Sequence, residues 1–237
     1  MTNVYTKKSE DTWNAIAKSF DSTRRKPWKE CIDFINDLPK ISTVADIGCG
    51  NGRHLIPCAK HCKKVIGVDV SKELLKIVQR KINENNLTNV KLIQSDAVNI
   101  PLKDNTVDAV LFIATMHNIP QRYRRIKSLT EITRILKKDG TAIISVWSRW
   151  QDKFRQHFIK KCLTNVTRKE FGDIDIYWRQ HGLNIARFYH LYSKRELQND
   201  IKQAGLDIIK IEGVKYFSKK YNDNYFAYVS KDNKHIK

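Results

Sequence analysis

A glycine turn directly after a short apolar run is the feature that most constrains the fold of this chain. The run at residues 44–47 is β-prone, and glycines follow at three alternate positions, Gly48, Gly50 and Gly52. A helix-compatible segment, residues 53–60, comes next. Glycines suit such a turn because they adopt positive φ angles and let a ligand approach the backbone closely. The order of strand, turn and helix predicts an α/β fold with a ligand site at the turn.

An acid stands just before this turn. Asp46 lies two positions before Gly48, and the spacing G-x-G-x-G differs from the G-x-G-x-x-G of dinucleotide-binding proteins. A carboxylate here would repel a pyrophosphate but could hold a cationic amine. The alternative is a glycine-rich turn without a ligand. The pattern is similar to the D-x-G-x-G-x-G motif of the S-adenosylmethionine-dependent methyltransferases, which implies that Asp46 and the three glycines bind this cofactor.

Two more acids end predicted strands. Asp69 ends the apolar run 64–69, at about the distance from the glycines at which an acid binds ribose hydroxyls in βαβ nucleoside sites. The alternative is a surface aspartate at a strand end. Asp96 follows the predicted strand 90–94, and the methyltransferase resemblance implies that it lies beside the adenine amino group, with Ala97 next to it.

A fourth strand, 106–113, leads into a loop that begins at Ala114 and contains His117. Ligands of α/β sheets bind at the carboxyl ends of the strands, so we expect Ala114 to border the cofactor. His117 could orient an acceptor group, act as a base, or pack under the loop. After it, residues 121–138 predict a helix that ends at Gly140, with Arg122, Arg124, Arg125 and Lys127 on a solvated face.

Length and composition favour one domain. The 237 residues, 41% hydrophobic and 29% charged, are typical of one folded unit with decorations. Residues 1–40 predict a helical lid, with helices at 10–20 and 28–37, and residues 148–190 form a basic, aromatic insertion. A helix at 194–203 and strands at 206–214 and 225–230 complete an α/β sheet that is mostly parallel and seven-stranded, with an antiparallel last strand.

The charge points to a polyanionic partner. Lys and Arg number 44 against 25 Asp and Glu, which gives a formal net charge of +19. Such a field attracts nucleic acid, although general solubility is an alternative explanation. No apolar run is long enough to cross a bilayer and the N-terminus does not resemble a signal peptide, so we expect a cytoplasmic protein without a membrane partner.

The composition of the insertion has two explanations. Aromatic and cationic residues alternate in the insertion, from Arg149 to Arg168 and Lys169, as in surfaces where rings stack on bases and cations meet phosphates. An amphipathic helix covering the sheet explains the same composition equally well.

The five cysteines lack a disulfide spacing, so we expect them to be reduced thiols, and we expect no metal site.

Two more segments sharpen the resemblance. The N-terminal stretch 13–28, which contains Thr-Arg-Arg-Lys-Pro-Trp, and the run Arg-Phe-Tyr-His at 187–190 resemble the tRNA wobble-uridine carboxymethyl methyltransferases. That resemblance implies a class I methyltransferase fold and methylation of the carboxylate of 5-carboxymethyluridine at tRNA position 34. It implies that Arg24 or Arg25 holds the carboxylate while His117 orients it. It also implies substrate or tRNA contacts by Lys26, Trp28, Arg149, Arg187, Tyr189 and His190, and a small zinc-binding activator subunit as a possible partner in a heterodimer.

Two other functions remain open at this point. A methyltransferase for small quinones or carboxylic acids would use the same cofactor, but it does not account for the basic charge. An RNA-binding protein that keeps the fold without catalysis would not need the acids at the strand ends.

Overall fold

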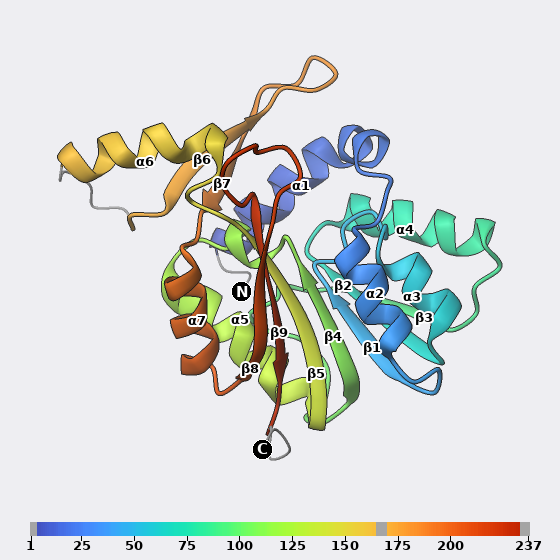
Figure 1. Cartoon of the computed structure of the whole chain (residues 1–237). Coiled ribbons are helices and arrows are strands. Elements are labelled where there is room, and N and C mark those ends of the chain that lie inside the picture. Colours follow the sequence, from blue (N-terminus) through green and yellow to red (C-terminus); the bar gives the residue numbers. More distant parts are fainter. Residues whose placement is uncertain (1–3, 165–169, 233–237) are drawn as a thin grey trace.

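One seven-stranded sheet organises the structure, a computed structural model that describes residues 4–164 and 170–232 (Figure 1). Its strand order is β3-β2-β1-β4-β5-β9-β8. The strands are β1 (Thr43–Ile47), β2 (Lys64–Asp69), β3 (Val90–Gln94), β4 (Val107–Ile113), β5 (Leu136–Trp147), β8 (Asp207–Val214) and β9 (Asn224–Ser230). The first five pair in parallel, whereas β9 is antiparallel to both of its neighbours. The predicted sheet, including its antiparallel last strand, is confirmed.

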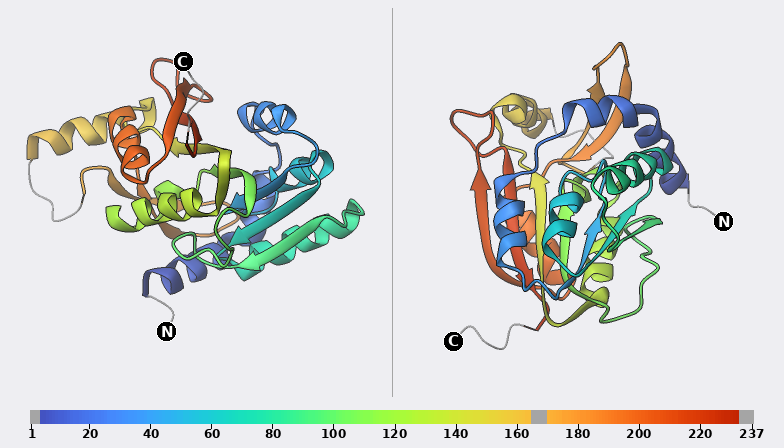
Figure 2. Two further views of the ribbon diagram at one scale, coloured as in Figure 1. Left: turned by 90° about the horizontal axis from the view of Figure 1, so that it is seen from below. Right: turned by 90° about the vertical axis from the view of Figure 1, so that its right-hand side faces the viewer.

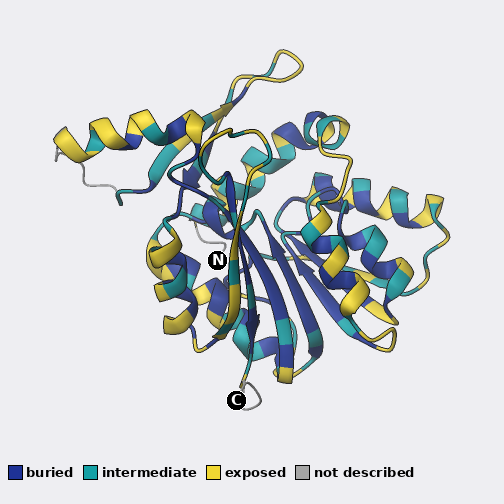
Figure 3. Cartoon of the chain, viewed as in Figure 1, coloured by how far each residue is buried: buried dark blue, intermediate teal, exposed yellow. Residues whose placement is uncertain are grey.

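Helices cover both faces of this sheet, because its central strands are apolar on both sides. On one face α2 (Lys29–Asp37), α3 (Leu55–His61) and α4 (Lys72–Glu84) pack against Val44 and Leu111. On the other, α5 (Arg122–Ile135) and α7 (Lys194–Gln203) pack against Ala45 and Val110. Figure 3 shows the central strands of the sheet as the most buried part of the chain.

The order in which the chain adds strands to the sheet reverses at its centre, between β1 and β4. From β1 the chain proceeds through β2 to β3 at one edge, then returns to β4 on the other side of β1. The loops after β1 and β4 therefore lie side by side at the carboxyl ends, which is where ligands bind in open α/β sheets.

Two segments lie beyond the carboxyl ends of the parallel strands (Figures 1 and 2). The first is α1 (Val4–Thr23), which starts earlier than the predicted helix and contacts α4 and β7. The second is the insertion, made of α6 (Asp152–Thr164) and a separate hairpin of β6 (Asp173–Trp178) and β7 (Ile185–His190). Arg168 and Lys169 lie outside the described residues.

Neither of the two alternatives from the sequence, an RNA-binding surface or an amphipathic helix, describes the whole insertion. Only its first half is a helix, and several of its aromatic rings pack together in a small core of their own. This core contains Phe154, Phe158, Tyr189 and Leu191, with Trp147, Trp150 and Phe171 against it. These rings are therefore largely used in packing.

The prediction for the α5 helix was wrong in two respects. The helix ends at Ile135, because Leu136 already pairs with Val107 of β4, and the strand bulges before it reaches Thr141. In addition, Arg124 and Arg125 are buried and not solvated. Within the described residues, no helix is both long and apolar enough to span a bilayer.

Candidate active site

A cleft of about 960 Å³ opens at the carboxyl ends of the central strands. Its walls come from the loops after β1, β2, β3 and β4, from α1 and the segment after it, and from the insertion. The predicted site residues that line it are Arg24, Arg25, Lys26, Trp28, Gly48, Gly50, Asp69, Asp96, Ala97, Ala114, His117, Arg187 and Tyr189.

The glycine turn forms the floor of this cleft. Gly48, Gly50 and Gly52 all have positive φ angles, of 70°, 55° and 78°. A Cβ atom on Gly48 would lie 2.2 Å from the Oγ1 atom of Thr115, in the loop after β4, so only glycine allows these two loops to meet. Gly52 packs against Val78 of α4 and does not line the cleft. The turn therefore offers a ligand a wall of backbone atoms.

Asp46 lies buried at the end of β1 and does not line the cleft. Its Oδ2 atom has no hydrogen-bond partner among the described residues. Burial raises the pKa of Asp46 to about 7, helped by the charge of Asp69 and opposed by that of Arg53. An unpaired buried carboxylate is costly, and a cation that entered the site would compensate it.

Asp69 joins the glycine turn to the start of α4. One carboxylate oxygen accepts the N–H of Gly50 at 2.8 Å, and the other accepts that of Ser71 at 2.8 Å. Burial raises the pKa of Asp69 to about 6, although these backbone hydrogen bonds oppose the rise. Each oxygen keeps a second acceptor position, so Asp69 can still accept two hydroxyl protons from a ligand in the cleft.

Asp96 is held by the chain itself. Its Oδ2 atom accepts hydrogen bonds from Arg124 of α5 at 2.7 Å and from Thr6 of α1, and its Oδ1 atom accepts the N–H of Val98 at 3.1 Å. Asp96 therefore fastens α1 and α5 to the loop after β3. Its capacity to accept a further proton from a ligand is smaller than that of Asp69.

His117 lies at the inner end of the cleft and is buried. Its Nδ1 atom accepts the N–H of Trp147 at 3.1 Å, so in the neutral ring the proton sits on Nε2. Burial, together with the charges of Arg187 and His190, lowers the pKa of His117 to about 3. The ring is therefore a neutral hydrogen-bond donor through Nε2, and a role as base is disfavoured.

Arg187 and Tyr189 complete this inner end. Tyr189 stacks on His117, and its hydroxyl accepts a hydrogen bond from Arg187 at 2.6 Å. The Arg187 guanidinium lies 4.8 Å from the ring centre of Trp178. It makes no ion pair with a carboxylate in the described part of the chain, and its buried Nε atom has no partner there. Burial lowers the pKa of Arg187, and no carboxylate of the described residues compensates this buried cation.

The outer end carries exposed cations. Arg24, Arg25 and Lys26 are exposed at the mouth, and Arg24 lies over Trp178. Trp28 lines the cleft too, but its ring already contacts Arg53, Tyr216 and Phe226. We therefore interpret Trp28 as part of the wall.

Two predicted tRNA contacts lie elsewhere. Arg149 is buried, donates to Glu196 and to the Leu191 carbonyl, and does not line the cleft. His190 is also buried, with its ring nitrogens 2.7 Å from Asp173 and 2.8 Å from Glu196. Both side chains lie there for the same physical reason, because each is hydrogen-bonded to Glu196 of α7 and so joins the insertion to that helix.

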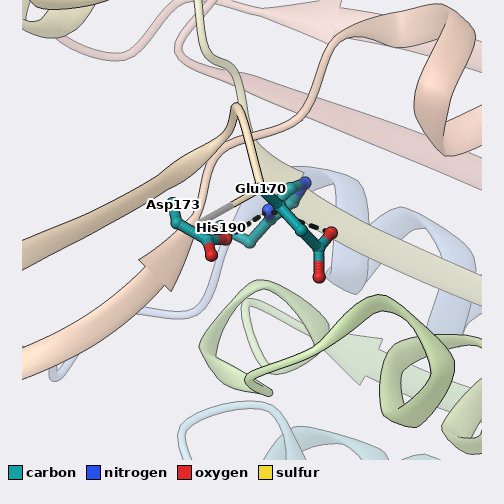
Figure 4. A group of neighbouring side chains, drawn as sticks. All are labelled: Glu170, Asp173 and His190. Atoms are coloured by element: carbon teal, nitrogen blue, oxygen red, sulfur yellow. Dashed lines mark hydrogen bonds and ion pairs between the residues drawn. The ribbon is translucent and has the colours of Figure 1, made fainter. Parts of the chain in front are cut away.

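His190, Asp173 and Glu170 are close enough to hold a metal ion, with their ligand atoms within 4.8 Å of one another (Figure 4). Each already has a partner, because Asp173 binds His190 and Glu170 accepts a hydrogen bond from the buried Arg125. We interpret the group as an ion-pair network that fixes the insertion to α5.

A search of protein families matches residues 45–144 to the model described as a methyltransferase domain. Among curated proteins, the tRNA (carboxymethyluridine(34)-5-O)-methyltransferase of Schizosaccharomyces pombe is 31% identical over 220 residues, 84% of this chain and 88% of that protein. The chain belongs to this methyltransferase family. A second member, alkbh8 of Xenopus tropicalis, is 37% identical over 155 residues, which cover 65% of this chain. This chain spans only 23% of the length of the Xenopus protein.

Solved structures agree on the fold of this family member. A SAM-dependent methyltransferase from Methanosarcina mazei matches with a TM-score of 0.72 at 17% identity, covering 87% of this chain and 98% of that one. A methyltransferase solved in complex with the Trm112 activator of Haloferax volcanii matches with a TM-score of 0.67 at 16% identity, over 98% and 100% of the two chains. The predicted class I S-adenosylmethionine-dependent methyltransferase fold is thus confirmed.

Sequence reasoning overlooked part of the site. Arg53 directly follows the glycine turn, lies 4.4 Å from the ring centre of Trp28, and lines the cleft. Because Arg53 directly follows Gly52 in the sequence, the glycine motif alone could have identified it as a site residue. The contribution of Tyr216 and Phe217, from the loop between β8 and β9, carried no such signal because that loop lies far along the chain.

Proposed function

We propose that this chain transfers a methyl group from S-adenosylmethionine to the carboxylate of a 5-carboxymethyluridine at the wobble position of tRNA. Membership of the family supports the substrate class. The observation that carries the proposal is the buried Arg187 guanidinium, which faces the same cleft as the glycine turn and has no carboxylate partner among the described residues.

The cofactor end of the cleft suits this proposal. Although Asp46 does not line the cleft, its unpaired buried carboxylate would attract the cofactor's ammonium group, and Asp69 has free acceptor positions for ribose hydroxyls. The backbone at Gly48 and Gly50 lets a ligand approach closely, and Ala97 and Ala114 border the cleft. When bound there, S-adenosylmethionine supplies a methyl group activated by its sulfonium charge.

The acceptor end would bind a carboxylate. Arg187 provides a buried cation, and the Nε2–H of His117 provides a hydrogen-bond donor beside it. A carboxylate is already ionised at neutral pH, so the chain needs no base and has only to place an oxygen atom in line with the methyl carbon. Because Tyr189 contacts both Arg187 and His117, we propose that it fixes their relative positions.

These two donors should position the nucleophile without neutralising it. A very strong grip on the carboxylate would stabilise the ground state and slow the transfer. Arg187 shares its guanidinium with the Tyr189 hydroxyl and with the ring of Trp178, which moderates its hold on a substrate. Arg24, Arg25 and Lys26 are then left for the phosphates of the RNA at the mouth.

We also propose a protein partner and a lid. The Haloferax methyltransferase of similar fold was solved with the Trm112 activator, which supports a small activator subunit here. Polar contacts tie α1 to the cofactor end, among them those of Asn14 with Ser71 and of Asp21 with Asn51. The segment before β1 would thus close over bound cofactor.

The test is a methyl-transfer assay with labelled S-adenosylmethionine and tRNA, with and without an activator subunit. We expect the label as a base-labile ester in the anticodon loop. Label found only in small organic metabolites would contradict the proposal in favour of a small-molecule methyltransferase. Binding of tRNA without consumption of cofactor, in the presence of the activator, would contradict it in favour of an RNA-binding protein.

A further inference from the structure

The loop between β8 and β9 places an aromatic ring in solvent at the mouth of the cleft. Phe217 is 94% exposed, and the exposed Lys215, Lys219 and Lys220 lie close to it in the chain. A single exposed apolar side chain is common on proteins and means little by itself. The construction of the loop around Phe217 is what gives it significance.

Two carboxylates hold the loop backbone in one conformation. Asp223 accepts the N–H groups of Tyr216, Phe217 and Ser218, at 2.7, 2.7 and 2.9 Å. Asp152, the first residue of α6, accepts those of residues 219, 220 and 221, at 2.9, 3.2 and 3.2 Å. Six consecutive backbone donors are therefore bound, and the exposed ring stands on a rigid support.

The loop has a hollow on its other side. Phe217 and Ser218 line the main cleft, whereas Lys220 and Tyr221 line a separate hollow of about 280 Å³. Trp150, Arg155 and Tyr225 also line this hollow, and the Arg155 guanidinium lies 4.6 Å from the ring centre of Tyr221. The loop thus separates the cleft from a second site that is both aromatic and cationic.

Rings beside cations suit single-stranded nucleic acid, because bases stack on the rings while phosphates meet the cations. A protein partner is the less favoured occupant, since lysine is depleted in protein interfaces. We propose that this loop and hollow bind a nucleotide next to the target uridine. Phe217 stacks on its base, and Arg155 and Lys220 bind its phosphate. This inference rests on the proposed function, which makes RNA the substrate.

The first experiment measures affinity for a labelled anticodon stem-loop RNA by fluorescence anisotropy. We expect Phe217→Ala to weaken binding roughly tenfold, as loss of one stacked base does, and Phe217→Trp to restore it. Phe217 is exposed, so its replacement removes little packing. Ile41→Ala is the matched control, because Ile41 is 79% exposed just before β1, at the opposite end of the sheet. Equal affinity of Phe217→Ala and wild type would overturn the proposal.

The second experiment uses charge and salt. Arg155→Gln should lower the slope of log affinity against log salt by about 0.7, the value for one phosphate contact in a single strand. An unchanged slope would mean that Arg155 does not bind a phosphate of the RNA.

The third experiment separates RNA from a protein partner and from failure of the proposed function. Phe217→Ala should raise KM for the stem-loop by about the factor by which it weakens RNA binding. If the substitution instead weakens binding of the activator subunit and spares RNA affinity, the loop is a protein interface and the proposal is wrong. The anisotropy assay needs no catalysis, so it tests Phe217 even if wild-type protein transfers no methyl group.

Discussion

The imidazole of His117 lies stacked against the phenol ring of Tyr189, with ring centroids 5.2 Å apart and 20° between the planes. The stack fixes the plane of the His117 ring, and the hydrogen bond that Nδ1 accepts from the N–H of Trp147 fixes its tautomer. A neutral imidazole that donates through Nε2 can hold a carboxylate oxygen but cannot accept a proton there.

His117→Ala should therefore lower kcat/KM for tRNA by roughly ten- to a hundredfold, the effect of one hydrogen bond to a charged group. Because its pKa is lowered to about 3, His117 stays neutral across the assay range, and the wild-type pH–rate profile should lack an inflection near 6.5 that belongs to His117. Comparing the profiles of both proteins tests this. An inflection that disappears in the variant would identify His117 as a base instead.

Replacement of Arg187 should separate activity from stability. The guanidinium is buried without a carboxylate partner in the described chain, so Arg187→Gln removes the carboxylate site without breaking an ion pair. We expect KM for tRNA to rise at least tenfold, while the midpoint of thermal unfolding stays the same or increases. Arg25→Gln, at the exposed mouth, is the comparison and should change mainly the salt dependence of tRNA binding. A large loss of stability in Arg187→Gln would show that the residue is structural.

Asp46→Asn should stabilise the protein without cofactor and weaken cofactor binding. The pKa of Asp46 is raised from 3.8 to about 7, so the native state holds a proton that the unfolded state releases, and this stability is lost as pH rises through about 7. The free energy of unfolding of Asp46→Asn should therefore exceed that of wild type by an amount that grows between about pH 4 and pH 7 and is constant above pH 7. Urea unfolding at several pH values measures it.

The same variant should bind S-adenosylmethionine at pH 8 with an affinity lower by about 2 kcal/mol or more, as removal of one partner of a buried charge pair does. Titration calorimetry measures this difference. Unchanged affinity would mean that Asp46 does not meet the ammonium group.

The sequence was sufficient to predict the parts of the site that depend on local order. Asp46, Gly48 and Asp69 come from strand ends and a turn, and the parallel sheet brings such ends together regardless of the rest of the chain. The presence of His117 and Arg187 in one cleft could be expected only from family resemblance, because 69 residues and most of the insertion separate them in the sequence. The stacking of His117 on Tyr189 could not be expected at all.

The same limit explains the errors. Arg149 and His190 have the composition of an RNA-binding surface, but their burial depends on Glu196 of α7, which no local pattern links to them. Arg125 belongs to a helix that carries several arginines close together in the sequence, and we expected such a group on a solvent-exposed face. Only the folded insertion supplies Glu170 to pair with it.

Arg125 gives the last prediction, on stability. Its side chain is fully buried, donates to Glu170 and to the Tyr192 hydroxyl, and so joins α5 to the insertion. Arg125→Met should lower the free energy of unfolding by about 3 kcal/mol, since both partners lose their donor in a buried site. Lys127→Met, on an exposed position of the same helix, should change it by less than about 0.5 kcal/mol. Equal urea midpoints for the two variants would mean that Glu170 turns to solvent at no cost, and that the network does not hold the insertion in place.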